Sequence, residues 1–121
     1  MTGEDIKPLW WVGSSKRDLQ DMPDEVQDTF GFALHMAQIG AKHAKAKVLK
    51  GFGSAGVLEV VEDADSNTYR AVYTVRFVDA VYVLHCFQKK SHQGIATPKQ
   101  DMELVVQRLK IAETQAKGAQ K

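Results

Sequence analysis

Hydrophobic positions along the chain repeat with helical spacing in some stretches and form short strand-like runs in others. A short apolar run that ends at Gly13 predicts a first strand, and the serines after it can cap a short helix. Apolar residues three or four positions apart predict one helix from Pro23 to about Gly40, and another that begins at the capping box Thr97-Pro98-Lys99-Gln100. Further apolar runs separated by turn residues predict strands. The predicted elements are residues 9–12, 14–22, 23–40, 57–62, 68–77, 80–88 and 97–113.

The order of these elements, β-α-α-β-β-β-α, predicts a single α+β domain. We expect a small antiparallel sheet with the helices packed on one of its faces. Residues 1–113 would form this domain, and residues 114–121 would form a polar C-terminal tail that frays. Glycines in residues 51–56 predict a loop before the second strand. Because this loop lacks the Gly-Lys-Ser/Thr sequence and the following helix of a phosphate-binding loop, we do not expect nucleotide binding there.

Side chains alternate between the two faces of a strand, and this alternation divides residues 68–90 into two sets. A two-residue loop at Val78-Asp79 would place Phe87 opposite Arg70 and His85 opposite Val72. The face predicted to be open carries Arg70, Arg76, Val81, Val83, His85, Phe87 and Lys89. The face predicted to lie in the core carries Tyr69, Ala71, Tyr73, Val75, Phe77, Ala80, Tyr82, Leu84 and Cys86.

Charge is nearly balanced overall, with a net charge of +1, but it is unevenly distributed. Residues 42–50 and 85–100 carry lysines and histidines and no acid, whereas residues 18–28 and 59–65 are acidic. A nearly neutral chain can therefore present a basic face to nucleic acid. The alternative is that these lysines are simply solvated.

The single cysteine, Cys86, excludes an intramolecular disulfide and a multi-cysteine metal site, and it fits a reducing compartment. Alternation places Cys86 on the core face, where its thiol would be buried and inert. The polar start of the chain has no signal-peptide pattern, and no apolar run is long enough for a membrane helix. We therefore expect a cytoplasmic protein that does not engage a membrane.

The predicted open face has the side chains that RNA cleavage needs. An RNA strand is cut when a 2′-hydroxyl attacks the adjacent phosphate, which requires proton transfers and stabilisation of the phosphate charge. Arginine matches phosphate with a planar pair of donors, and lysine or histidine can move protons. This chemistry needs no metal and no cofactor. The alternatives are that the arginines keep an exposed face soluble, that His85 is a packing residue, and that Phe87 packs under the last helix instead of stacking on a base.

Two stretches carry a resemblance to a known family. They are Asn67-Thr68-Tyr69-Arg70-Ala71-Val72-Tyr73-Thr74-Val75-Arg76-Phe77, and Val81-Tyr82-Val83-Leu84-His85-Cys86-Phe87-Gln88-Lys89-Lys90-Ser91 followed by Gly94-Ile95-Ala96-Thr97-Pro98. From Leu9 to about Glu113 the chain resembles the phage-derived, HigB-like branch of the RelE/ParE toxin superfamily. The resemblance implies a RelE-like fold in a type II toxin. Such toxins cleave mRNA, usually on the ribosome, and a helix-turn-helix antitoxin protein neutralises them.

The resemblance also implies roles for basic residues. Arg70 and Arg76 would hold the scissile phosphate, Lys89 or Lys90 would help with charge or proton transfer, and Lys50 also matches the basic motif of the family. Combined with strand alternation, the predicted catalytic residues are Arg70, Arg76, Lys89 and His85. The predicted RNA-binding residues are Lys47, Lys50, Phe87, Lys90 and His92.

The chain departs from the family pattern in two places. Many relatives have a basic residue in the strand after the glycine loop, where this chain has Glu59 and Glu62. Several RelE-type toxins use a late tyrosine or histidine near the chain end. In this chain no tyrosine follows Tyr82 and His92 is the last histidine, which leaves His85 and His92 as candidates for the general acid. The acidic strand motivates an alternative function, a non-catalytic toxin-fold module that binds RNA or gyrase, or a degenerate regulatory copy.

Overall fold

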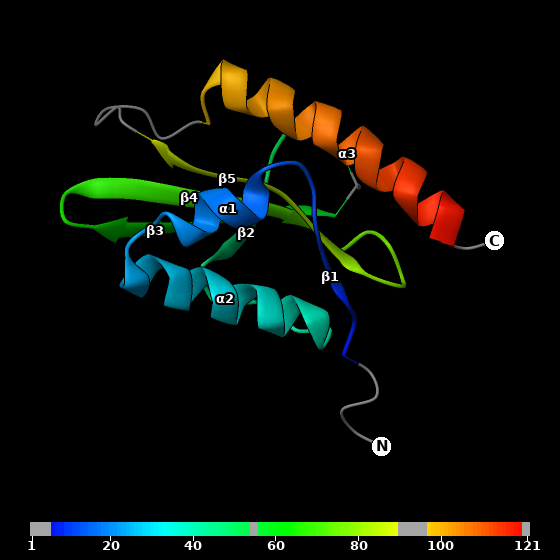
Figure 1. Ribbon diagram of the computed structural model, residues 1–121, viewed down its shortest axis with the longest axis horizontal. Helices are drawn as coiled ribbons and strands as arrows, with labels where there is room; N and C mark the ends of the chain where they lie inside the picture. The colour runs from blue at the N-terminus through cyan, green and yellow to red at the C-terminus, as the bar shows by residue number, and fades with distance from the viewer. Residues whose placement is uncertain (1–5, 54–55, 90–96, 120–121) are drawn as a thin grey trace.

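A computed structural model describes residues 6–53, 56–89 and 97–119. Within these residues the fold is a five-stranded sheet with three helices, which confirms the α+β class (Figure 1). The elements are β1 Leu9–Trp11, α1 Ser15–Gln20, α2 Asp24–Gln38, β2 Ala46–Val48, β3 Val57–Ala64, β4 Asn67–Thr74, β5 Val81–Lys89 and α3 Lys99–Ala119. The short strand β2 lies in the lysine-rich stretch, where the sequence did not predict a strand.

The sheet has the strand order β1-β5-β4-β3-β2. As predicted, β3, β4 and β5 form an antiparallel meander. β3 and β4 meet at the two-residue turn Asp65-Ser66, whose φ angles of 52° and 68° are those that a tight hairpin turn requires. At the two edges, β1 runs parallel to β5 and β2 runs antiparallel to β3.

The helices cover both faces of the sheet, so the prediction that they pack on one face is wrong. α1 and α2 cover one face, and α3 crosses the other (Figure 1). The physical reason is that the strands carry apolar side chains on both faces. Val60 and Val83 pack with α2, whereas Val72 and Leu84 pack with the apolar side of α3. The face predicted to be open is therefore the α3 face.

A β-bulge changes the predicted facing of part of β5. The predicted register holds from Thr68 opposite Lys89 to Val72 opposite His85, but it shifts between Val72 and Tyr73. The strands end at Thr74 and resume at Val81, so the connecting loop is longer than two residues. As a result, Tyr82 and Leu84 belong to the α3 core, and Val81 and Val83 belong to the α2 core, the reverse of the prediction.

The C-terminal stretch is more ordered than the sequence suggested. α3 continues to Ala119, and Ala116 is buried in the α3 core. Residues 114–119, which the sequence assigned to a polar tail, are thus the last turns of α3. In the described part of the chain, no helix has the length and apolarity that crossing a bilayer would require.

Candidate functional site

Four charged or titratable side chains gather on the α3 face, at the end of the sheet near the first turn of α3. They are Glu59 of β3, Arg70 of β4, and His85 and Lys89 of β5, and we call them the polar cluster. Arg70, His85 and Lys89 are each only 6% exposed. The sequence predicted Arg70, His85 and Lys89 on an open face, and their burial corrects this prediction. Residues at the start of α3 contact two of them, since Thr97 lies against Arg70 and Asp101 against His85. Phe87 is buried beside them in the α3 core, as the packing alternative predicted.

Arg70 is anchored by a carboxylate that the sequence analysis did not assign to the site. Its Nη1 donates to Glu59 Oε2 at 3.0 Å and lies 3.4 Å from Thr97 Oγ1. Thr97 in turn donates to the same carboxylate oxygen at 2.8 Å. Both charged side chains are largely buried, and removing either one would leave the other charge without its partner. The pair therefore fixes the guanidinium and the carboxylate in position.

His85 is held between α3 and Phe87. Its Nε2 lies 2.7 Å from Asp101 Oδ1, and its Nδ1 lies 3.4 Å from Arg108 Nη1. Because a guanidinium can only donate, Nδ1 accepts and Nε2 carries the proton that is donated to Asp101. Burial lowers the pKa of His85, the Arg108 charge adds to this effect, and Asp101 opposes it. The ring also stacks on Phe87, with centroids 4.6 Å apart. Burial, together with the Arg108 charge, outweighs Asp101 and favours a neutral imidazole.

Lys89 shares the cluster with two charged neighbours. Burial lowers the pKa of its ammonium group, and the positive charge of Arg70 lowers it further, whereas Glu59 acts in the opposite direction. A lysine with a lowered pKa gives up its proton more readily than a solvated one. The arrangement therefore suits proton exchange better than a plain surface lysine would.

A groove brings three of the predicted phosphate-contacting residues together. It has a volume of about 370 Å³ and lies between β2, the following loop and the start of α3. Lys47 and Lys50 are exposed, and Arg70 lies deeper with Glu59 and Thr97. The lining residues are Lys47, Val48, Leu49, Lys50, Glu59, Arg70, Thr97 and Met102. We call this hollow the basic groove.

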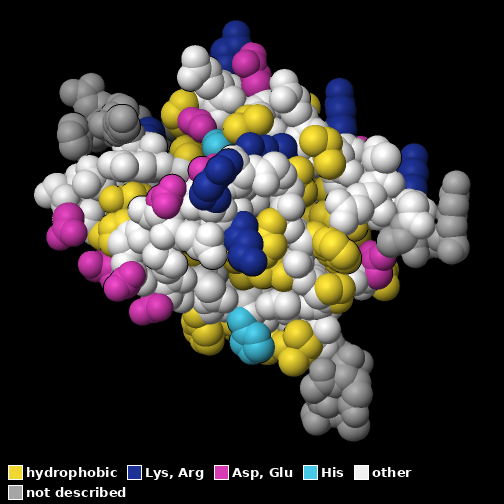
Figure 2. Space-filling view, in the orientation of Figure 1, with side chains coloured by type: hydrophobic (Ala, Val, Ile, Leu, Met, Phe, Trp, Pro, Cys, Tyr) yellow, Lys and Arg dark blue, Asp and Glu magenta, His cyan; other side chains and the backbone are white. Residues whose placement is uncertain are grey.

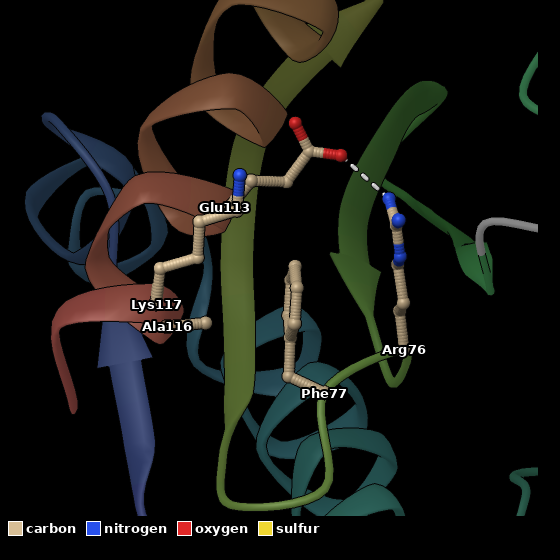
Figure 3. Close-up of a pocket in the computed structure, with 5 residues that line it drawn as sticks. All are labelled: Arg76, Phe77, Glu113, Ala116 and Lys117. Atoms are coloured by element: carbon tan, nitrogen blue, oxygen red, sulfur yellow. Dashed lines mark hydrogen bonds and ion pairs between the residues drawn. The ribbon is translucent and has the colours of Figure 1, made fainter. Parts of the chain in front are cut away.

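Arg76 does not join the polar cluster, which corrects the prediction that it shares a strand face with Arg70. It lies in the β4–β5 loop, where its Nη1 pairs with Glu113 Oε2 at 2.5 Å (Figure 3). Asp101 and Glu113 are about 18 Å apart along the axis of α3, as expected from the helical rise per residue. Arg76 instead borders a smaller hollow of about 210 Å³, together with Phe77, Glu113, Ala116 and Lys117.

Two of the predicted RNA-binding residues, Lys90 and His92, lie outside the described residues.

Acidic side chains gather toward the end of the molecule where the β3–β4 turn and the start of α2 lie (Figure 2). In the ranges that the structure describes, no group of three or more histidine, cysteine or acidic side chains could hold a metal ion.

Four residues that belong to the polar cluster or contact it were not predicted as site residues from the sequence: Glu59, Thr97, Asp101 and Arg108. Glu59 had a usable signal, since alternation on its strand and the register with β4 put it on the same face as Arg70. Asp101 and Arg108 had none, because their contacts depend on which face of the sheet α3 covers. Only the three-dimensional arrangement reveals those contacts.

The five-stranded sheet and three helices of the described residues are consistent with a small α+β toxin fold. Residues 17–110 match the family model described as phage derived protein Gp49-like (DUF891), so the chain belongs to this family, which is RelE-like. No curated protein and no solved structure matches the chain.

Proposed function

We propose that this protein is the toxin of a type II toxin–antitoxin system, of the HigB-like kind, and that it cleaves mRNA on the ribosome in the cytoplasm. One observation carries the proposal: Lys47, Lys50 and Arg70 line one groove. Lysines on an exposed rim can hold the phosphates of a single strand, and the positive charge of a fixed guanidinium deeper in the groove can stabilise a phosphate. Membership of a family that is often toxin-like supports the same conclusion.

In the proposed reaction, the 2′-oxygen forms a bond to phosphorus and the bond from phosphorus to the 5′-oxygen breaks. The products are a 2′,3′-cyclic phosphate and a 5′-hydroxyl. Arg70 stabilises the charge that develops on the phosphate, and the amine of Lys89, with its lowered pKa, takes the proton of the 2′-hydroxyl. The 5′-oxygen takes a proton from a cationic side chain of the groove, for which Lys50 is well placed at the rim. The lowered pKa of His85 makes it a weaker candidate for the acid.

The proposal includes a protein partner. A basic groove on a toxin must be covered when the toxin is silent, and a helix-turn-helix antitoxin with an acidic or helical segment would cover it. Co-expression of the adjacent gene should then restore growth. Failure of the small proteins encoded by the adjacent genes to bind the chain would contradict this part of the proposal.

Reversing the charge of the groove tests the nuclease. The double variant Lys47→Glu/Lys50→Glu changes two exposed side chains, so it should fold normally but lose mRNA cleavage by at least about tenfold, because each lost phosphate contact weakens binding. New 5′-hydroxyl ends on cellular mRNA would be mapped after induction. The control Lys16→Glu/Lys110→Glu makes the same charge change at exposed positions outside the groove and should cleave like the parent. Full cleavage by the groove variant would overturn the proposal.

A second candidate function follows from one observation. Glu59 already neutralises Arg70, which would suit a toxin-fold module that binds without cleaving. Growth arrest with intact mRNA and failing DNA supercoiling would favour a gyrase-binding module. Absence of any growth effect would favour a regulatory copy.

A further inference from the structure

On the inner wall of the basic groove, the described residues donate no hydrogen bond to one oxygen of the Glu59 carboxylate. Both hydrogen bonds of the Glu59 carboxylate, from Arg70 and from Thr97, go to Oε2. Oε1 takes part in none of the hydrogen bonds and ion pairs between the described residues. The side chain is only 12% exposed, and it lines the groove. An accessible acceptor that is held in place by the contacts of its sister oxygen is suited to a ligand that donates to it.

The walls around this oxygen suit a flat, partly apolar ligand. Val48, Leu49 and Met102 line the groove together with the two rim lysines. A thioether such as that of Met102 makes favourable contacts with aromatic rings. Lysines at the rim would hold phosphates on either side of such a ring. This combination matches one nucleotide of a single-stranded RNA, with its base inside the groove and its backbone at the rim.

We propose that the groove selects an RNA base with an exocyclic amino group next to a ring acceptor, as in adenine and cytosine, which donates its amino hydrogen to Glu59 Oε1. The inference rests on the proposed function, since it names the part of the RNA that the same groove takes. Carboxylates are known to accept from the amino group of cytosine, and the amino group of adenine is a donor of the same kind. The neighbouring ring acceptor can receive a hydrogen bond from a rim lysine.

The same geometry disfavours the other two bases. Uracil offers one N–H between two carbonyl oxygens, and a carboxylate repels both of these acceptors. Guanine offers two adjacent donors that need both oxygens of a carboxylate, and Oε2 already accepts from Arg70 and Thr97. Because these two contacts prevent the carboxylate from turning, the selection does not require reorganisation on binding.

The substitution Glu59→Gln provides a sharp test. The amide carbonyl of the new side chain can still accept from Arg70 and Thr97, which directs its NH₂ group into the groove. The position facing the base then changes from an acceptor to a donor. We expect the order of preference to reverse in favour of uracil, whose carbonyl oxygens can accept.

Binding would be measured by fluorescence anisotropy with the full chain and labelled 2′-O-methyl hexanucleotides of adenine, cytosine or uracil. These cannot be cleaved because they lack the attacking hydroxyl. The parent protein should bind the adenine and cytosine hexamers about tenfold more tightly than the uracil hexamer, as expected for one good base contact. Glu59→Gln should abolish or reverse this difference. Met102→Ala should weaken the binding of all three hexamers without changing the order of their affinities, since base stacking tolerates any base.

Glu62→Gln is the matched control. It makes the same change on the same strand, at a side chain that pairs with Lys45 and Thr29 away from the groove, and it should keep the parent's preference. Equal binding of the three hexamers by the parent, no binding of any of them, or an unchanged order in folded Glu59→Gln would each overturn the inference. Should Glu59→Gln fail to fold, the base preference of the parent protein and the binding of Met102→Ala still test the inference.

The inference and the proposed function can fail separately. Base preference in this assay together with intact mRNA in cells would retain the selective groove and reject the nuclease. Cleavage of mRNA without any base preference would retain the nuclease and reject the selective groove.

Discussion

Cys86 and His85 are neighbours on β5 that face opposite sides of the sheet, and their surroundings give them different chemistry. Cys86 is buried in the α2 core, as predicted, and burial raises the pKa of its thiol to about 12. The thiolate is the reactive form. We therefore expect a thiol reagent at pH 8 to modify the native protein on the order of a thousandfold more slowly than the urea-unfolded chain. The rate of modification would be followed by the absorbance of the reagent. Rapid modification of the native protein would show that this side of β5 opens readily.

His85 should make stability depend on pH. Its pKa in the folded protein is lowered from the usual 6.5, so the unfolded chain binds more protons as the pH falls through that value. Stability from the neutral ring is therefore present above about pH 6.5 and is lost as the solution becomes more acidic. We expect the urea midpoint of the parent to fall more between pH 7.5 and pH 5.5 than that of His85→Gln. His35→Gln, an exposed position of α2, serves as control and should keep the parental slope. Identical slopes for the parent and His85→Gln would contradict this expectation.

At the scale of elements, one glycine governs how α3 meets the β1–α1 connection. Gly13 has a φ of 60°, and a Cβ there would lie 2.8 Å from the Arg108 guanidinium. That guanidinium donates to the Leu84 carbonyl at 2.9 Å and to Ser14 Oγ at 3.2 Å. Gly13→Ala should therefore lower the free energy of unfolding by about 2 kcal/mol, from backbone strain and loss of these contacts.

Gly31 provides the matched comparison for Gly13. It lies within α2, and a Cβ there would meet nothing within 4 Å. Gly31→Ala should raise the free energy of unfolding by about 0.5–1 kcal/mol, because alanine favours the helix. Both variants would be measured by urea denaturation. Equal effects of the two substitutions would show that Arg108 can move aside without loss.

Much of the secondary structure could be predicted from the sequence, because it depends on local patterns. The helices and the meander followed from apolar spacing. The pairing of Arg70 with Phe87 was predicted from a two-residue loop, and it holds because the longer loop and the bulge offset each other in the register. The bulge at Val72/Tyr73 was missed because two strands with continuous apolar runs give no signal for one extra residue. β2 was missed because three residues in a lysine-rich stretch carry no recognisable period.

The candidate site was predicted in part. Lys47, Lys50 and Arg70 were each named from the sequence, and the structure places them around one groove. Arg76 was grouped with Arg70 on the assumption of an uninterrupted strand, which the β4–β5 loop contradicts. The burial of the cluster could not be predicted, since it depends on the path of α3 across the sheet. The roles of these residues remain proposals.

At the scale of the whole molecule, one sheet serves two cores. Leu34 is buried in the core between α2 and the sheet, and Leu84 is buried in the core between α3 and the sheet. Since β3, β4 and β5 contribute to both, loss of packing on either side should destabilise the entire fold. Leu34→Ala and Leu84→Ala should each cost about 2–5 kcal/mol, and each variant should still unfold in a single transition. The unfolding curves of each variant would be recorded by tryptophan fluorescence and by circular dichroism, and the two curves should coincide. Two separate transitions in either variant would mean that the cores unfold independently.

The parallel pairing of β1 with β5 has a consequence for how the chain reaches this fold. Leu9 pairs with Val81, across most of the chain, whereas β3, β4 and β5 are joined by short connections. Because closing a long loop is slow, we expect β1 to dock after the meander has formed. Until then the outer edge of β5, within its apolar run from Val81 to Leu84, would be open to strands of other molecules. Refolding yield should therefore decline with protein concentration, and a folding chain is most prone to aggregation in the interval before its first strand is in place.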